Sequence, residues 1–340
     1  MGKAVIGLIA NPASGRDIRR LVAHASVIDN VEKANIVKRI IITLEALGVS
    51  KIIVMPETFG ITERAISMLP KKPSIDIEFI NMRVRGDWLD TYYAANYMKG
   101  KVNAIISIGG DGTNRVIAKT DIEVPVMPIS TGTNNVFPYM IEATIAAAAT
   151  AVIALGVVPL EEATFKSKRV EIWRNGELSD IALVDAATTV HQFIGSRAVW
   201  KPEFIREVVS CLCAPYNIGL SSLPGVYRTI THEIDEGMYI RISPTGKEKV
   251  SVPIAPGLFR SFNIGEHRLL KIGEHVEIKT KPSIIALDGE RTLEIHKGDD
   301  VTAVITRKGL RVIDYKKALI LASKRGFFEY IALKKALQNS

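Results

Sequence analysis

One carboxylate set among glycines is the feature of this sequence that most directly suggests chemistry. Asp111 stands between Gly110 and Gly112 in the segment GGDGT, directly after the apolar run Val102–Ile108. Glycine lets a backbone adopt positive φ and approach a ligand closely, so such a segment can cradle a phosphate. A carboxylate repels phosphate, but it can bind Mg²⁺ or accept a proton from a hydroxyl nucleophile. The alternative is a plain turn in which Asp111 caps a helix.

Two further loops offer the same kind of group. NPASG (11–15) precedes Arg16, Arg19 and Arg20, which share one helix face, and STGTNNVFP (130–138) carries hydroxyls and amides ahead of an expected helix interrupted by Pro138. After GGDGT, a helix is expected over 114–120, with its positive N-terminal end toward the loop. The candidate phosphate-binding residues are Asn11, Ser14, Gly15, Gly109, Gly110, Gly112, Thr113, Asn114, Thr131, Gly132, Thr133, Asn134 and Asn135.

Alternating strands and helices place these three loops together. Apolar runs predict strands at 4–10, 51–56, 74–81, 102–108 and 124–130, and helical spacing predicts helices at 31–48, 62–69 and 87–100. This alternation predicts a Rossmann-like parallel sheet with right-handed crossovers. Ligands of such sheets bind beyond the carboxyl ends of the strands, where all three loops lie.

The second half of the sequence has a different pattern. Short alternating strands and the turn pairs Asn175-Gly176 and Asp288-Gly289 predict antiparallel hairpins. We therefore expect an α/β nucleotide-binding domain over 1–160 and a β-rich, sandwich-like domain for substrate or oligomerisation over 161–315. The helical tail, 316–340, is expected to pack back on the first domain.

Composition narrows the class of protein. The chain has 340 residues with 47% apolar and 24% charged residues and a net charge of +8. Its basic residues are scattered and are not interleaved with aromatic ones, so we expect no nucleic-acid partner. The apolar segment 143–160 is rich in alanine and closed by Gly156 and Pro159, which indicates a buried helix and no membrane insertion.

The two cysteines and the first residues of the sequence indicate in which cellular compartment the protein is expected. Cys211 and Cys213 are too close in sequence to favour a disulfide and lack a second pair for a zinc site. The first predicted strand begins at once, without a signal pattern. A reducing, cytoplasmic setting follows as an expectation.

The three motifs, in this order and spacing, resemble the superfamily that unites NAD kinases with diacylglycerol and sphingoid-base kinases. NNVFP (134–138) and the layout of most of the chain look closest to the ATP-NAD kinase-like branch that includes AcoX-type proteins. The resemblance implies ATP-dependent, Mg²⁺-dependent phosphorylation of a hydroxyl by a homo-oligomer that binds small-molecule nucleotides. It places Asp111 at the acceptor hydroxyl, as the base or as a metal-linked carboxylate, and the GGDGT glycines with Thr113 around the nucleotide phosphates. The favoured acceptor is the adenosine ribose 2′-hydroxyl of NAD.

Differences from the motifs of NAD kinases leave the identity of the acceptor molecule undecided. The Asn-Asn-Glu motif of NAD kinases is missing, since Val136 follows Asn135, and only GLSSLPGVYR (219–228) loosely matches their dinucleotide loop. Glu290 matches the Asp-Gly-Glu of lipid kinases, which implies a second metal-linked carboxylate, although Asp288-Gly289 also suits a simple hairpin turn. The alternatives are therefore a lipid kinase and a non-catalytic nucleotide-binding protein. Asp185 is a further candidate in the cleft between the domains, and His191 is better explained as a structural histidine.

Overall fold

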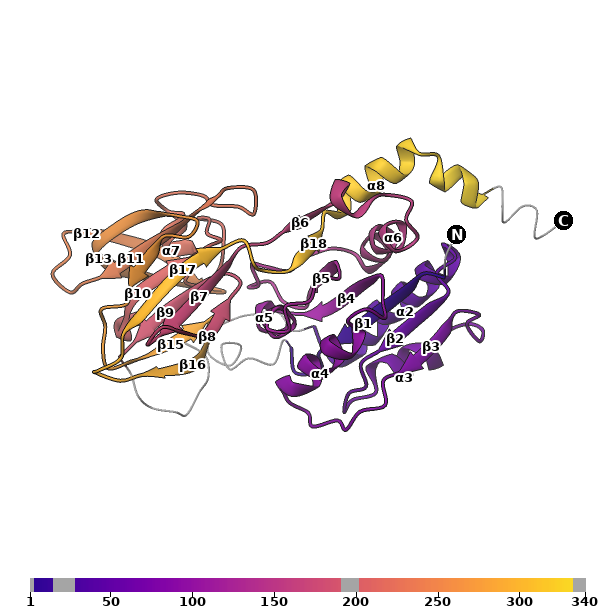
Figure 1. Cartoon of the computed structure of the whole chain (residues 1–340), viewed down its shortest axis with the longest axis horizontal. Coiled ribbons are helices and arrows are strands. Elements are labelled where there is room, and N and C mark those ends of the chain that lie inside the picture. The colour runs from indigo at the N-terminus through magenta and orange to yellow at the C-terminus, as the bar shows by residue number, and fades with distance from the viewer. Residues whose placement is uncertain (1–2, 15–27, 191–201, 333–340) are drawn as a thin grey trace.

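The parallel sheet expected from the sequence forms the first part of the molecule. A computed structural model describes residues 3–14, 28–190 and 202–332 (Figure 1). The first sheet has the order β3-β2-β1-β4-β5-β18-β6, in which the first five strands run parallel. Its strands are β1 (Val5–Ala10), β2 (Lys51–Val54), β3 (Asp76–Phe79), β4 (Ala104–Gly109), β5 (Val126–Ser130), β6 (Thr164–Lys166) and β18 (Arg311–Ile313).

Helices cover both faces of this sheet, as expected for a Rossmann-like arrangement. One hydrophobic cluster joins a sheet face to α2, α3, α6 and α8, and a second joins the other face to α4 and α5. The helices are α2 (Asn30–Ala46), α3 (Ile61–Ser67), α4 (Trp88–Met98), α5 (Asp111–Ala118), α6 (Ala143–Ala154) and α8 (Tyr315–Lys324). The side chains of Asp29, Asp87 and Glu142 each cap a helix by accepting a backbone N–H.

The alanine-rich segment forms the buried helix that the sequence predicted. α6 contacts α2 on one side and α8 on the other, and its alanines allow the close approach. Across the described residues, no helix is both long enough and apolar enough to cross a membrane. α8 returns to the α/β part, as expected of the tail, and residues 333–340 lie outside the described chain.

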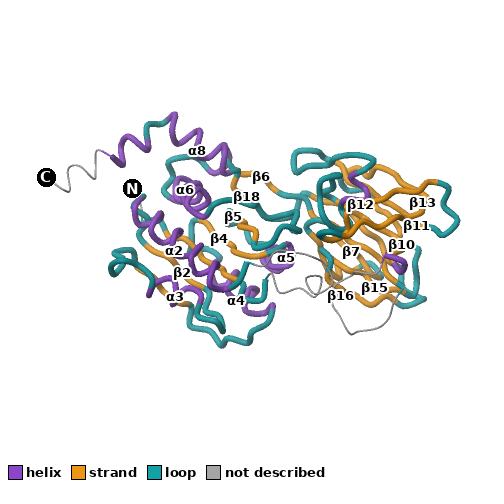
Figure 2. The backbone as a smooth tube through the Cα atoms, turned by 180° about the vertical axis from the view of Figure 1, so that it is seen from behind, coloured by secondary structure: helices purple, strands orange, loops and turns teal. Residues whose placement is uncertain are grey.

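Two antiparallel sheets form the β-rich part of the molecule (Figures 1 and 2). The larger has the order β12-β13-β11-β10-β9-β15-β16 and the smaller β14-β17-β7-β8. Their strands are β7 (Arg169–Arg174), β8 (Glu177–Ala182), β9 (Asp185–Thr189), β10 (Ile205–Ser210), β11 (Glu236–Ile242), β12 (Glu248–Ala255), β13 (Leu258–Lys271), β14 (His275–Glu277), β15 (Ser283–Leu287), β16 (Glu290–Ile295) and β17 (Val301–Thr306). Short helical turns lie at η1 (Leu160–Glu162), η2 (Pro202–Phe204) and α7 (Ser222–Gly225).

Both predicted two-residue hairpin turns are confirmed. Asn175 and Gly176 have φ of 53° and 83° between β7 and β8, and Asp288 and Gly289 have φ of 51° and 81° between β15 and β16. Two successive positive φ values define the type I′ turn, whose twist matches that of the strands. Asp288 is thereby held at the tip of a rigid hairpin.

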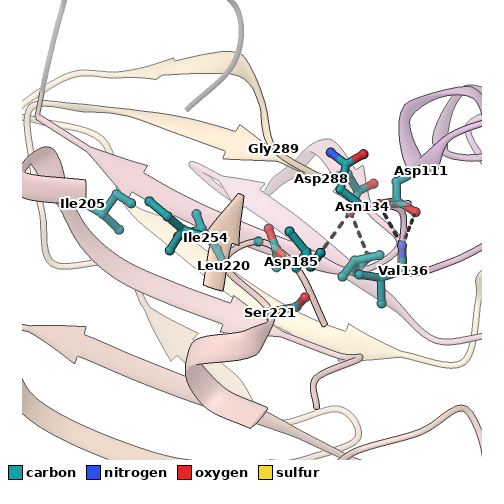
Figure 3. Close-up of a pocket in the computed structure, with 13 residues that line it drawn as sticks. Asp111, Asn134, Val136, Asp185, Ile205, Leu220, Ser221, Ile254, Asp288 and Gly289 are labelled. Carbon is teal, nitrogen blue, oxygen red and sulfur yellow. Dashed lines mark hydrogen bonds between the residues drawn. The ribbon is translucent and has the colours of Figure 1, made fainter. Parts of the chain in front are cut away.

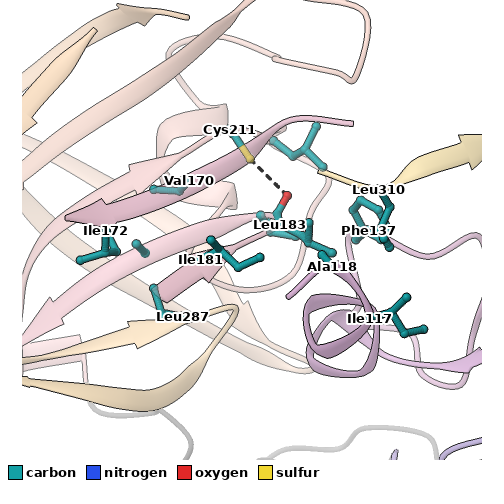
Figure 4. Packing of buried hydrophobic residues seen from close by; sticks show 14 of the residues in the cluster. Ile117, Ala118, Phe137, Val170, Ile172, Ile181, Leu183, Cys211, Leu287 and Leu310 are labelled. Atoms are coloured by element: carbon teal, nitrogen blue, oxygen red, sulfur yellow. Dashed lines mark hydrogen bonds between the residues drawn. The ribbon is translucent and has the colours of Figure 1, made fainter. Parts of the chain in front are cut away.

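A continuous apolar core fixes the two parts against each other. Ile117 and Ala118 of α5 belong to the same cluster as Val170, Leu183 and other residues of the β-rich part (Figure 4). The Sγ of Cys211, one of two buried free thiols, donates to the carbonyl of Leu183 at 3.1 Å. The domain boundaries at 160 and 315 stay predictions, and the neighbouring β6 and β18 both join the first sheet. Because α5 packs into the shared core, its N-terminal end has a fixed place between the two parts.

His232 makes the stability of this junction depend on pH. Its ring packs against Phe137 and Phe165, and burial, together with the nearby Lys168 and Arg307, lowers its pKa from 6.5 to about 4. Between these values the unfolded chain binds a proton that the folded chain does not. We therefore expect the free energy of unfolding to fall by up to about 3 kcal/mol as pH drops from 6.5 to 4. Denaturant titrations should show this extra loss in the wild type but not in His232→Leu, and parallel pH curves would contradict it.

Candidate functional site

The three polar loops meet at the carboxyl edge of adjacent strands β1, β4 and β5. The Nδ2 of Asn11, after β1, donates to the Oγ1 of Thr113, after β4, at 2.9 Å. The Oγ1 of Thr131, after β5, donates to the Oγ of Ser14 at 3.1 Å. Hydrogen bonds between side chains thus join the loops into one polar floor, as the sheet topology predicted.

The glycines of GGDGT do not adopt the backbone conformation that the sequence suggested. None of Gly109, Gly110 and Gly112 has positive φ, so that expectation is wrong. Side chains approach them instead: a Cβ on Gly110 would lie 2.7 Å from the Oδ1 of Asn135, and one on Gly112 would lie 3.1 Å from the Oε1 of Glu290. A Cβ on Gly109 would overlap the side chain of Thr113. Glycine is required because neighbouring loops pack directly onto this backbone.

Two predicted helix boundaries are also wrong. α5 begins at Asp111, with Gly110 as its N-cap, and not at residue 114. The backbone over 131–142 contains no helix after the STGTNN segment, because Tyr139 pairs with β5 instead. The carboxylate of Asp111 therefore lies at the N-terminal end of α5, where the helix dipole is positive.

Backbone amides of the 131–142 loop hold the Asp111 carboxylate. Its oxygens accept from the N–H of Val136 at 3.1 and 3.2 Å and from the N–H of Phe137 at 2.8 Å. The sequence offered no sign of this contact across 25 residues. The loop that follows β5 thus orients the carboxylate that follows β4.

Several predicted phosphate-binding residues use their side chains to shape the loops. The buried Asn114 accepts from the Oγ of Ser107 at 2.7 Å and donates to the carbonyl of Gly110 at 2.9 Å. Asn135 donates to the Oγ of Ser130 at 2.8 Å. Among the others, Thr131 and Gly132 are buried and Thr133 is exposed. Gly15, with Arg16, Arg19, Arg20 and His191, lies outside the described residues.

A pocket of about 510 Å³, open mouth included, lies between Asp111 and the β-rich part (Figure 3). Asp111 and Asn134 line it from the polar loops, and Asp185 and Asp288 line it from the larger antiparallel sheet. Ser221, from the segment that loosely matched a dinucleotide loop, lines the pocket too. Its apolar lining comes from Val136, Val184, Ile205, Ile218, Leu220 and Ile254. The pocket thus combines apolar walls with carboxylates, which is the usual composition of a small-molecule site.

Asp288 is anchored more strongly than its turn requires. Its carboxylate accepts from the backbone N–H of Leu183, Val184 and Asp185 at 2.8 to 3.3 Å. Burial raises its pKa, while the Arg115 guanidinium and the three amides oppose that rise. The hairpin turn and the buried anchor are therefore combined in one residue.

A buried arginine links α5 to the hairpin. Arg115 lies one helical turn after Asp111, and its guanidinium is 3.4 Å from Glu290, 3.6 Å from Asp180 and 3.9 Å from Asp288. Lys119 joins the cluster through a 2.7 Å contact with Asp180. Arg115 and Asp180 were not among the residues predicted from the sequence. The spacing of four residues between Asp111 and Arg115, which places both on one helix face, was an available signal for Arg115.

The described residues fit a magnesium ion if substrate phosphates supply part of its coordination. Glu290 lies against Gly112, which is next to Asp111 in the chain, so two carboxylates border the phosphate loops. Within the part of the chain that the structure describes, no cluster of three or more His, Cys, Asp or Glu side chains is arranged to hold a metal. Mg²⁺ is usually bound by one or two carboxylates together with substrate phosphates, which matches this arrangement.

The chain is similar to known proteins along most of its length. Residues 6–157 match the ATP-NAD kinase N-terminal domain, and residues 168–308 match the acetoin catabolism protein X C-terminal domain. The acetoin catabolism protein X of Cupriavidus necator is 35% identical over 322 residues, covering 91% of this chain and 90% of that protein. This chain belongs to the acetoin catabolism protein X family. The predicted resemblance is confirmed.

A solved structure shows the fold. Yeast NADH kinase in complex with NADH matches with a TM-score of 0.51 at 12% identity, over 93% of this chain and 86% of that one. A diacylglycerol kinase from Bacillus anthracis has a TM-score of 0.48 at 16% identity, over 92% of this chain and 96% of that one. The match to yeast NADH kinase shows that the chain has an NAD kinase-like fold, with a parallel α/β part and a β-rich part, as predicted.

Proposed function

We propose that this family member transfers the γ-phosphoryl group of ATP to a hydroxyl of a small molecule bound in the pocket. The observation that carries the proposal is the double position of Asp111. This residue belongs to the floor formed by the three polar loops and also lines the pocket of the β-rich part. A carboxylate held between a phosphate site and an acceptor site is what hydroxyl phosphorylation needs.

The proposed reaction follows from this placement. The carboxylate of Asp111, held by the Val136 and Phe137 amides, accepts the proton of the acceptor hydroxyl. The hydroxyl oxygen bonds to the γ-phosphorus of ATP, the bond from that phosphorus to the β,γ-bridging oxygen breaks, and ADP leaves. The N-terminal end of α5 stabilises the negative charge of the phosphates. Asp111 and Glu290 would hold Mg²⁺, which supplies charge neutralisation when bound with the nucleotide.

NAD is the acceptor that we propose, at the 2′-hydroxyl of its adenosine ribose. The match to the ATP-NAD kinase N-terminal domain supports the reaction class. The pocket supports the acceptor, because apolar walls suit a nucleoside and Asp111 and Asp185 line the same pocket. Carboxylates accept hydrogen bonds from vicinal ribose hydroxyls.

The test is an assay of the purified protein with ATP and Mg²⁺, offering NAD, NADH, diacylglycerol and a sphingoid base separately, with products identified by mass. NADP formation is the expected result. Phosphorylated lipid would replace NAD with a lipid acceptor and keep the phosphotransfer. Nucleotide binding without any product would favour the non-catalytic alternative.

A further inference from the structure

A buried lysine lies directly beneath the first polar loop. Lys33, on α2, is 1% exposed, and the structure gives its Nζ three backbone acceptors in that loop. They are the carbonyls of Asn11 at 2.9 Å, Pro12 at 3.2 Å and Ser14 at 2.7 Å. Burying a lysine is costly unless its ammonium is fully hydrogen-bonded, so its presence calls for an explanation.

These contacts decide which way the loop faces. Three carbonyl oxygens carry partial negative charge and would repel phosphate if they pointed outward. Lys33 turns them toward α2, which leaves the side chains of Asn11 and Ser14 to face the neighbouring loops. Those side chains make the bonds to Thr113 and Thr131 that unite the phosphate floor.

The hydrogen bonds form one continuous chain. Thr131 donates to Ser14, and Ser14 donates to the carbonyl of Asn11 at 2.7 Å. The same carbonyl accepts from Lys33, and the Asn11 side chain donates to Thr113. Such chains strengthen cooperatively in a buried setting, so a change at Lys33 reaches both other loops.

We infer that Lys33 is a positioning residue for phosphate binding: it sets the Asn11–Ser14 loop so that all three loops can receive the phosphates of the nucleotide. The inference rests on the proposed function for the location of the phosphates. It requires that loss of the Lys33 ammonium lowers the affinity for ligands that carry phosphate groups, and that the fold and the affinity for the nucleoside stay unchanged.

The experiment compares the affinities of ATP and adenosine for the full-length protein. ATP binding with Mg²⁺ is followed by calorimetry, and adenosine binding by NMR so that a weak affinity is measurable. Lys33→Met removes the ammonium and keeps the unbranched stem. We expect ATP to bind about 10- to 100-fold more weakly and adenosine to change by less than about twofold. Lys38→Met, a partly exposed lysine on the same helix, is the matched control and should change neither affinity.

Each other outcome decides against the inference. Unchanged ATP affinity in Lys33→Met, or equal weakening of ATP and adenosine, would show that Lys33 has no specific part in phosphate binding. If Lys33→Met does not fold, Lys33→Gln, whose shorter side chain and two donors cannot satisfy all three carbonyls, is compared in the same way and should also weaken ATP more than adenosine. Wild-type protein that binds ATP but phosphorylates nothing would overturn only the proposed function. Wild-type protein that binds no ATP would overturn both.

Discussion

We expect Asp111→Asn to lower the kcat for phosphoryl transfer by about 10²- to 10⁴-fold, the usual contribution of a general base. The amide cannot take the proton of the acceptor hydroxyl. Its oxygen can still accept the N–H of Phe137, so the loop after β5 stays in place. Steady-state kinetics with the acceptor found in the product assay measure the effect, and the affinity for ATP measured without Mg²⁺ should change by less than about threefold.

Asp121→Asn is the matched control for this variant. Asp121 lies just beyond the other end of α5, is exposed, and has a φ of 49°, a conformation that asparagine tolerates well. Its kcat should remain at the wild-type value. A kcat in Asp111→Asn above about a tenth of the wild-type value would exclude Asp111 as the base.

The structure also changes which substitution is informative at Asp111. Asp111→Ala also removes the proposed base. That variant would leave the N–H groups of Val136 and Phe137 without their acceptor, at a cost of about 1–3 kcal/mol for each buried donor. Asp111→Asn removes the base but keeps an acceptor for these N–H groups, so it tests catalysis without a large loss of stability.

The sequence was sufficient for features that depend on local patterns. Alternating apolar runs placed β1 to β5 and the helices between them, and Asn175-Gly176 and Asp288-Gly289 specified their turns because type I′ geometry demands such residues. The loops at the strand ends then followed from parallel topology alone.

Features that depend on tertiary contacts could not be predicted in this way. The segment 131–142 was expected to contain a helix interrupted by Pro138, yet it forms turns and bends, and Tyr139 is bridged to β5. The glycines of GGDGT suggested unusual φ values, whereas their actual constraint comes from Asn135 and Glu290, which are distant in sequence. Such constraints appear only when the chain has folded.

Lys33 shows that a signal can be present in the sequence and still be overlooked. It occupies the first position of a helical stripe that continues through Ile36, Val37, Ile40 and Ile41, all buried. A lysine at the start of an apolar stripe must bury its ammonium or extend it past the helix end. The Lys33 ammonium reaches back to the NPASG loop, whose carbonyls accept its hydrogen bonds.

The largest loss of stability is expected from Asp288→Ala. The variant leaves the N–H groups of Leu183, Val184 and Asp185 without their acceptor and removes a carboxylate that faces Arg115. Removing one partner of a buried charged pair typically costs about 3–5 kcal/mol. Two of these three residues, Val184 and Asp185, line the pocket, so phosphoryl transfer should fall together with stability.

Asn175→Ala isolates the part of this loss that comes from the turn. Asn175 holds the same position in the other type I′ hairpin, with a φ of 53° against 51° for Asp288, so both variants place alanine in the same strained conformation. The Oδ1 of Asn175 accepts only the exposed N–H of Asp300. Chemical denaturation should therefore give a loss for Asp288→Ala at least about 2 kcal/mol larger than for Asn175→Ala. Equal losses would mean that Asp288 acts solely as a turn residue, and the buried carboxylate would then have no part in joining the hairpin to the pocket.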